Sequence, residues 1–145
     1  MSELTIRRMT EADYDAVTDV WNASGLPVRP KGRDSKERVL RQIGEEGAFY
    51  LVAESEGDVI GVLLTTHDTR KGWLNRLAVR PEWRGRGVAT ALVHRAEDEL
   101  RAMDIRVYSV LIHADNSASR HLFNELGYKE HDDIVYLSKR LEDDD

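Results

Sequence analysis

The residues best suited to chemistry in this sequence form a short basic turn, Trp83-Arg84-Gly85-Arg86-Gly87, which precedes a run of helix-forming residues. Glycines let the backbone adopt positive φ and approach a ligand closely. A helix that begins directly after them leaves its first N–H groups unpaired, at the positive end of its dipole. Arginines add full charges and fork-shaped donors. The turn therefore predicts a site for a pyrophosphate group.

The same turn has a simpler interpretation, in which the glycines only redirect the chain and the arginines are solvated. Two better-known phosphate loops are excluded by spacing, because the sequence contains neither Gly-x4-Gly-Lys-Ser/Thr nor Gly-x-Gly-x-x-Gly with an acidic residue at the required distance. The chain has no cysteine, which excludes disulfides, thiolate metal ligands and a cysteine nucleophile. No other set of residues has metal-ligand spacing, and we expect no metal.

Length and charge limit what could surround the turn. With 145 residues, 41% of them hydrophobic, the chain suits one domain, which we place at residues 1–141, followed by an acidic tail at 142–145. The net charge of -6 argues against binding to nucleic acid. Residues 70–106 nevertheless hold nine Lys or Arg against five Asp or Glu, so the middle of the chain attracts anions.

Hydrophobic periodicity predicts an alternation of strands and helices. No apolar run approaches the ~18 residues of a membrane span and no leader-like segment is present, so we expect a cytoplasmic protein without a membrane segment. A capping box at Thr10 and Asp13 predicts a helix that ends at Gly25, and Asp34 or Ser35 caps the next one. Strands are expected at 4–8, 49–54, 59–67, 73–79, 105–113 and 134–141, and later helices at 88–103 and 117–126.

Two segments resemble the GNAT family of N-acetyltransferases. The first, 77–89, contains the family's acetyl-CoA loop pattern, Gln/Arg-x-x-Gly-x-Gly/Ala, at Arg84, Gly87 and Ala89. The second, 116–128, matches Asn-x-x-Ala/Ser-x-x-Leu/Phe-Tyr/Phe-x-x-x-Gly-Phe/Tyr. The resemblance implies an α/β (α+β) GNAT fold, with a mixed, mostly antiparallel sheet of about six to seven strands, splayed central strands and about four helices.

The resemblance also implies where acetyl-CoA, as cosubstrate, would bind. Its pantetheine arm would lie between the strands 73–79 and 105–113 and pair with backbone like an added strand, and residues 84–90 would hold its diphosphate. Asn116, taken alone, is more simply a helix cap. The implied contacts are Leu77, Ala78, Val79, Arg84, Gly85, Arg86, Gly87, Val88, Ala89, Thr90, Asn116, Ser119 and Phe123.

The implied reaction is direct attack of a neutral amine on the thioester, with the Val79 N–H meeting the developing oxyanion. Many members place a tyrosine, which protonates the departing sulfur, where this chain has Phe123. Tyr108, Tyr128 or a water could substitute. His67, Asp68, His113 and Asp115 are candidate bases, although each alone is more simply an exposed strand-end residue.

Several questions stay open at this point. We expect an N-acetyltransferase that acts on an amine-bearing small molecule or peptide; a non-catalytic acyl-CoA-binding domain is the alternative that Phe123 suggests. Which amine is accepted does not follow from the fold. Family members often dimerise through their C-terminal strands, so the resemblance also implies a homodimer.

Overall fold

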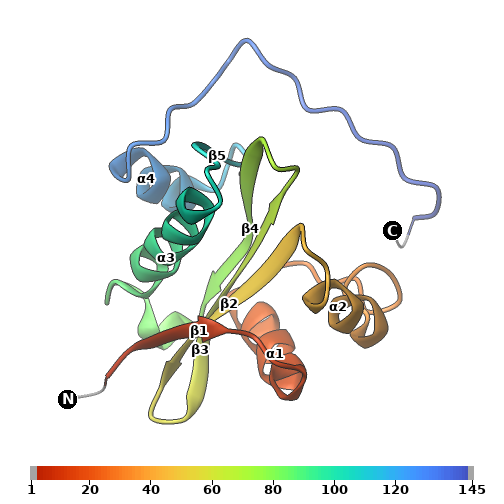
Figure 1. Cartoon of the computed structure of the whole chain (residues 1–145), viewed down its shortest axis with the longest axis vertical. Coiled ribbons are helices and arrows are strands. Elements are labelled where there is room, and N and C mark those ends of the chain that lie inside the picture. The colour runs from red at the N-terminus through yellow and green to blue at the C-terminus, as the bar shows by residue number, and fades with distance from the viewer. Residues whose placement is uncertain (1–2, 144–145) are drawn as a thin grey trace.

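A computed structural model describes residues 3–143 as one twisted sheet with helices on both faces (Figure 1). Within these residues the sheet has five strands, each hydrogen-bonded to the next along the chain. Neighbours are antiparallel except the last pair, which is parallel. The mixed, mostly antiparallel α+β class is confirmed. The strands are β1 (Thr5–Arg8), β2 (Ala48–Ser55), β3 (Asp58–His67), β4 (Lys71–Val79) and β5 (Val107–Val110).

Capping side chains precede a short 3-10 helix (Glu11–Asp13), which leads directly into the first α-helix, and the second α-helix. The N–H of Thr10 donates to the Asp13 carboxylate at 2.8 Å, in the expected capping box. Ser35 Oγ accepts from the N–H of Arg38 at 3.3 Å, so Ser35 rather than Asp34 caps the second helix. The four α-helices of the described chain are α1 (Tyr14–Ser24), α2 (Lys36–Ile43), α3 (Val88–Ala102) and α4 (Ser117–Glu125).

The sheet separates two hydrophobic clusters. Alternating side chains of β2 enter opposite clusters, and both Leu51 and Val52 are fully buried. One cluster joins the sheet to α3 and α4 through residues such as Leu92 and Phe123. The other joins it to α1 and α2 through residues such as Trp21. Burial on both faces fixes the central strands, and with them the position of β4.

The strand expected at 134–141 does not form, and β5 covers only part of the expected 105–113. The sheet of the described chain therefore has five strands instead of six to seven. Figure 1 shows the segment after α4 running clear of the folded body. A strand needs a neighbour to pair its backbone groups, and none of the described strands borders 134–141. Its sequence has strand character, but the segment pairs with none of the described strands.

Candidate functional site

The basic turn lies between the end of β4 and the start of α3. A short 3-10 turn (Pro81–Trp83) follows β4, and Gly85 and Gly87 then adopt positive φ of 75° and 81°. A Cβ added to either glycine would meet nothing within 4 Å, so the turn borders open space and not packed protein. The positive φ explains why glycine is needed at these two positions.

The amides from Gly85 of this turn to Thr90 of α3 are unpaired. The N–H of Arg84 donates to Pro81 O at 3.2 Å, and the N–H of Ala91 donates to Gly87 O at 3.0 Å. Between them, the N–H groups of 85–90 make no hydrogen bond to any described residue. No acidic residue lies in the first turn of α3, so the positive end of the helix dipole is not neutralised. Six main-chain donors are available together.

The two arginines of the turn are exposed and differ in their contacts. Arg84 Nη2 donates to Ser24 O at 3.4 Å, which links the turn to the end of α1. The Arg86 guanidinium lies 4.9 Å from the ring centroid of Trp83. Both side chains add positive charge beside the free amides. The backbone supplies the directed donors and the side chains supply the surrounding charge.

The strands β4 and β5 pair over only half of β4. Lys71–Leu74 pairs with Val107–Val110, while Asn75–Val79 has β3 as its only neighbour among the described strands. Arg80 donates its N–H to Ile60 O of β3 at 2.9 Å. Because successive N–H groups in a strand point to opposite edges, the N–H of Val79 points to the unpaired edge and that of Ala78 to β3. The sheet therefore opens next to the basic turn.

A β-bulge accompanies this opening. Leu63 of β3 faces two residues of β4, Arg76 and Leu77, and Arg76 has a positive φ of 55°. Its guanidinium lies 4.5 Å from the Trp21 ring centroid, and its Nη1 donates to Pro27 O at 2.8 Å. Burial lowers the pKa of Arg76, although its Nη2 lies 3.4 Å from the Asp34 carboxylate. The sequence leaves open whether Arg76 points into an acceptor groove or to solvent, and its partners Trp21, Pro27 and Asp34 do not follow from the sequence.

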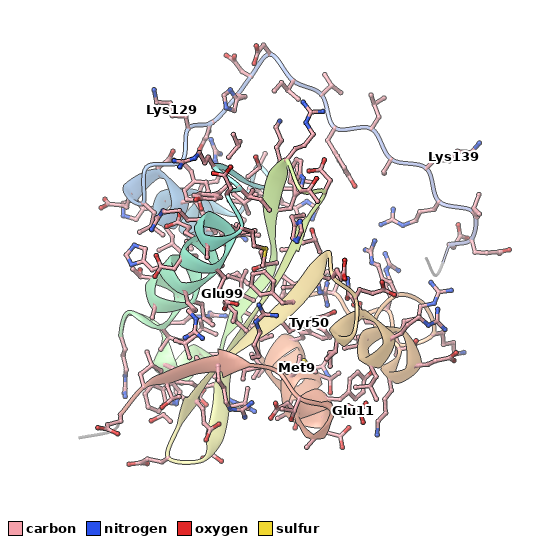
Figure 2. The ribbon with its side chains drawn as sticks, in the orientation of Figure 1. Met9, Glu11, Tyr50, Glu99, Lys129 and Lys139 are labelled. Atoms are coloured by element: carbon pink, nitrogen blue, oxygen red, sulfur yellow. The ribbon has the colours of Figure 1, made fainter. Side chains whose placement is uncertain are left out.

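The Arg76 cluster borders a hollow of about 330 Å³ on the α1 and α2 face of the sheet. Tyr50, labelled in Figure 2, lies at its border, and its hydroxyl is 2.6 Å from Gln42 Oε1. Burial raises the pKa of Tyr50, so its hydroxyl stays protonated. The charged side chains around the hollow are Arg33, Asp34, Arg38, Arg41, Glu45 and Arg76, an excess of positive charge.

Three aromatic residues, Tyr108, Phe123 and Tyr128, belong to the hydrophobic cluster that joins the sheet to α3 and α4. Phe123 is buried and packs edge-on against Tyr128, with ring centroids 5.0 Å apart. The Tyr128 hydroxyl donates to Glu97 at 2.6 Å, and burial together with this carboxylate raises its pKa. Tyr108 is half-buried, and its hydroxyl has no hydrogen bond within the described chain. Of the two tyrosines, Tyr108 alone has a free hydroxyl.

Asn116 and Ser119 are used together at the start of α4. Asn116 Oδ1 accepts from the N–H of Ser119 at 3.1 Å, so the helix-cap interpretation of Asn116 is confirmed. Its side-chain amide nitrogen makes no hydrogen bond to the described residues. Both residues follow β5 on the side where the sheet opens.

The candidate bases fall into two groups. Asp68 Oδ1 accepts from the N–H groups of Arg70 and Lys71 at 2.9 and 2.8 Å, which lowers its pKa. His67 Nδ1 accepts from the N–H of Thr69 at 3.0 Å in the same turn. This turn lies at the far end of β4, about 26 Å from Val79 at ~3.3 Å per residue. Asp68 and His67 are thus hydrogen-bonded within a turn that is distant from the unpaired amides of 85–90.

His113 and Asp115 are exposed and follow β5. Because β5 runs parallel to β4, His113 stands three residues beyond Val110 as Leu77 stands three beyond Leu74. His113 therefore follows β5 just beyond the point where its pairing with β4 ends. None of the ring or carboxylate atoms of these two residues bonds to another described side chain.

Residues 3–143 contain neither a membrane-spanning helix nor a cluster of metal ligands. No helix there is long and apolar enough to cross a bilayer. No group of three or more His, Asp or Glu in that range is arranged to hold a metal ion.

Comparison with known proteins agrees with this geometry. The structure is similar to the PaiA N-acetyltransferase of Thermoplasma acidophilum in complex with coenzyme A, with a TM-score of 0.82, 21% identity and coverage of 90% of this chain and 92% of that one. It is also similar to AAC(6')-Iy bound to a bisubstrate analogue, with a TM-score of 0.78, 20% identity and coverage of 96% of this chain and 99% of that one. A third similar structure is the ribosomal-protein-S18-alanine N-acetyltransferase of Escherichia coli, with a TM-score of 0.76, 20% identity and coverage of 89% of this chain and 79% of that one.

At these identities the structural matches establish the fold alone. A family model provides the assignment, because it covers residues 11–128, most of the chain, and includes both β4 with its basic turn and α4. The chain belongs to the acetyltransferase (GNAT) family.

Proposed function

We propose that this chain transfers the acetyl group of acetyl-CoA to a primary amine by direct attack of that amine. The observation that supports the proposal most is the set of six unpaired amides at 85–90, beside the opening between β4 and β5. Membership of the family makes the chain an acyltransferase with acetyl-CoA as its cosubstrate. The amine is the part for which the structure offers the least.

The residues present fit the chemistry of coenzyme A. A diphosphate needs several hydrogen-bond donors and positive charge, which 85–90 and the two neighbouring arginines supply. A pantetheine arm carries amide groups that can pair with an open strand edge, and Asn75–Val79 has one. A Cβ at Gly85 or Gly87 would meet open space, which leaves room for phosphate oxygens.

The reaction needs a neutral amine, since an alkylammonium with a pKa of ~10 has no free lone pair. A new C–N bond forms as the C–S bond breaks, and the amine loses a proton while the thiolate gains one. The Val79 N–H points to the unpaired edge, where it can stabilise charge on the carbonyl oxygen. A thiol with a pKa of ~8.5 is a tolerable leaving group without a general acid, which is compatible with Phe123.

For the proton of the amine we favour His113. It follows β5 just beyond the point where the pairing with β4 ends, and its ring has no partner among the described side chains. Asp115 is the second candidate, because it is exposed and directly precedes Asn116. The side chains of Asp68 and His67 already accept hydrogen bonds from amides of their own turn. Tyr108, half-buried with a free hydroxyl, is the candidate donor to the sulfur.

A second candidate function is acyl-CoA binding without efficient turnover. Phe123 favours it, because phenylalanine cannot donate a proton, and the Tyr128 hydroxyl is already engaged by Glu97. On this alternative the turn still binds coenzyme A. The two candidates therefore differ in thiol release and agree in affinity.

The test is a thiol-release assay with acetyl-CoA and a panel of amines. The panel contains an aminoglycoside, a polyamine, free amino acids, and peptides with a free N-terminus or a lysine. Amine-dependent release of thiol, with the acetylated product identified by mass spectrometry, supports the transferase. Calorimetric binding of acetyl-CoA without release on any acceptor favours the binding domain. Absence of binding would contradict both.

A further inference from the structure

The hollow of about 330 Å³ on the α1 and α2 face lies at the level of the sheet where the opening between β4 and β5 begins. Tyr50 of β2 pairs with Leu64 of β3, and Leu64 pairs with Asn75 of β4, so these three residues form one row across the sheet. Tyr50 and Leu64 both line the hollow. The pairing of β4 with β5 ends at Leu74, one residue before this row. The hollow therefore adjoins the half of β4 that has a free edge.

The two faces of the sheet differ in what they offer to a bound coenzyme. The unpaired amides of 85–90 lie at the start of α3, which packs on the face opposite to α1 and α2 (Figure 1). Under the proposed function, a coenzyme whose diphosphate lies at these amides reaches the opening from the α3 side. The face that carries the hollow is then left for the second substrate, the amine.

Positive charge dominates the side chains around the hollow. Four arginines border it against two carboxylates, those of Asp34 and Glu45. The Asp34 carboxylate is already engaged, because it accepts from the N–H of Arg29 at 2.7 Å and lies 3.4 Å from Arg76 Nη2. The four arginines are Arg33, Arg38, Arg41 and Arg76. The hollow therefore has more positive charge than its own carboxylates balance.

Two of these arginines are available to a ligand. The side chains of Arg33 and Arg38 are exposed and form no ion pair or hydrogen bond within the described chain. Arg41, by contrast, has the Glu37 carboxylate as its partner at 3.0 Å. A single exposed arginine is most simply a solvated charge. Here two such side chains border the same hollow as a third arginine that is largely withdrawn from solvent.

The third arginine, Arg76, is only 17% exposed at its side chain. Its Nε and Nη2 are buried without a hydrogen-bond partner in the described chain, although Nη2 is within ion-pair distance of Asp34. A buried charge with unmade hydrogen bonds is incompletely compensated. Because these nitrogens are covered by protein, Arg76 acts on the hollow through its electric field, which is screened less inside the protein than in water.

The net charge of the chain, -6, has the opposite sign to the charge around the hollow. Salt at physiological concentration screens exposed charges over about 8 Å, so distant carboxylates have little effect on a group in the hollow. The nearby arginines decide which group is bound there. An ammonium group would meet like charge, whereas a carboxylate or phosphate would meet complementary charge.

We infer that the hollow binds a carboxylate or phosphate group of the acceptor, so that the preferred substrate is a small amine that also carries a negative charge. This inference rests on the proposed function, which makes an amine the second substrate. A volume of about 330 Å³ is at the lower end for ligand pockets and suits a small molecule. Arg76 and Val79 are three residues apart, about 10 Å along β4 at ~3.3 Å per residue. A dipeptide extends about 7 Å, and the arginine side chains reach toward it.

The first test compares acceptors that differ only in the negative group, by thiol release from acetyl-CoA. Glycylglycine is paired with its C-terminal amide, and O-phosphoethanolamine with ethanolamine. We expect kcat/KM to be at least ~10-fold higher for the charged member of one pair, and that pair identifies the anion as a carboxylate or a phosphate. Equal values within both pairs, or a preference for polyamines and aminoglycosides, would overturn the inference and leave the proposed function intact.

Charge reversal tests whether the hollow causes this preference. Arg33→Glu/Arg38→Glu changes two exposed side chains, and Arg101→Glu is the matched control on α3, on the opposite face of the sheet. Each exposed charge pair is worth up to about fivefold, so the double variant should raise KM for the acidic acceptor ~10-fold or more. Its affinity for acetyl-CoA and its circular dichroism should match those of the wild type and of Arg101→Glu. An unchanged KM in the double variant would overturn the inference.

A binding measurement without turnover separates this inference from the proposed function. Glycylglycine and O-phosphoethanolamine are titrated into the full chain and followed by the NMR shifts of its backbone amides, with the uncharged partners as controls. Saturable shifts at 33–42 that are lost in the double variant support the anion site, even where no acceptor releases thiol and the proposed function fails. A phosphate at the free amides would shift 85–90 instead. Absence of saturable shifts at 33–42 with both charged probes would overturn the inference.

Discussion

The turns at the two ends of β4 contain similar polar and flexible residues, but they differ in whether their backbone amides are hydrogen-bonded. At 68–71 the Asp68 carboxylate accepts from the N–H groups of Arg70 and Lys71, so the turn satisfies its own donors. At 84–90 six N–H groups have no acceptor within the described chain. The first turn closes a hairpin, and the second leaves a set of donors that a ligand can use.

The comparison shows which kind of residue indicates a binding site in this protein. Carboxylates and imidazoles near a strand end suggest catalysis, yet Asp68 and His67 have partners in their own turn. The glycines have no chemistry of their own, but their positive φ keeps the surrounding amides unpaired. In this protein, unpaired main-chain donors therefore indicate a binding site better than carboxylates or imidazoles near a strand end. Four experiments follow from the comparison of the two turns, in order from the largest expected effect to the smallest.

The kcat values of His113 and Asp68 variants test the difference between the two ends of β4. We expect His113→Ala to lower kcat by ~10² or more, the loss typical of a removed general base, while Asp68→Ala leaves kcat close to the wild-type value. The measurement is thiol release at saturating acetyl-CoA with the best acceptor of the panel. A large loss in Asp68→Ala with normal His113→Ala would reverse the roles assigned to the two ends of β4.

Gly87→Leu tests the free amides directly. The side chain would occupy the open space beside the turn and block approach to the amides. Losing one hydrogen bond to a charged phosphate, worth about 1.5–3 kcal/mol, predicts ~10- to 100-fold weaker binding of acetyl-CoA by calorimetry.

Gly57→Leu is the control for backbone strain, since Gly57 has a φ of 85° and open space around it in the hairpin between β2 and β3. Both variants should lose some thermal stability, but only Gly87→Leu should lose affinity. Unchanged affinity in Gly87→Leu would remove the main support for the proposed function.

Asp13 is a second carboxylate that holds a turn, and unlike Asp68 it is buried. Hydrogen bonds from Arg7 lower its pKa from 3.8 to about 2. A lowered pKa stabilises the fold above the unfolded pKa, and this stabilisation is lost as the pH falls from about 4 to about 2. At pH 7 we expect Asp13→Asn to lower the free energy of unfolding by about 2 kcal/mol, from the size of the shift.

Urea unfolding at pH 7 and again near pH 2 checks this prediction. The difference between wild type and Asp13→Asn should shrink at the lower pH, where the wild-type carboxylate becomes protonated. A difference that stays constant with pH would mean that side-chain packing, and not the charge of Asp13, stabilises the turn.

Arg86→Ala tests the smaller contribution of side-chain charge beside the free amides. Arg86 is exposed, so we expect acetyl-CoA to bind about two- to fivefold more weakly, as for a surface charge pair. Added salt should reduce the difference. Arg101→Ala, at the far end of α3, should bind as the wild type does. A loss as large as that in Gly87→Leu would assign the binding to side chains instead of amides.

Much of this protein follows from its sequence because the relevant signals are local. The capping box at Thr10 and the caps at Ser35 and Asn116 depend on residues within one turn of each other. The apolar run of β2 is likewise visible over a few consecutive residues. The position of the glycine turn before α3 is local in the same way. Its role in binding coenzyme A stays a prediction, as do the roles of Val79, Tyr108 and His113.

Other features depend on partners far along the chain, which a sequence pattern does not identify. Asp68 resembles a catalytic carboxylate until its hydrogen bonds to the amides of its own turn are known. The sequence alone leaves Arg76 facing either an acceptor groove or solvent, and the structure places it against Trp21 and Asp34. The apolar alternation at 134–141 predicts a strand, but strand formation requires an unpaired edge. The sequence by itself determined which segments prefer to be strands and helices. The tertiary structure decided which backbone groups remain unpaired, because pairing depends on which strands become neighbours in space.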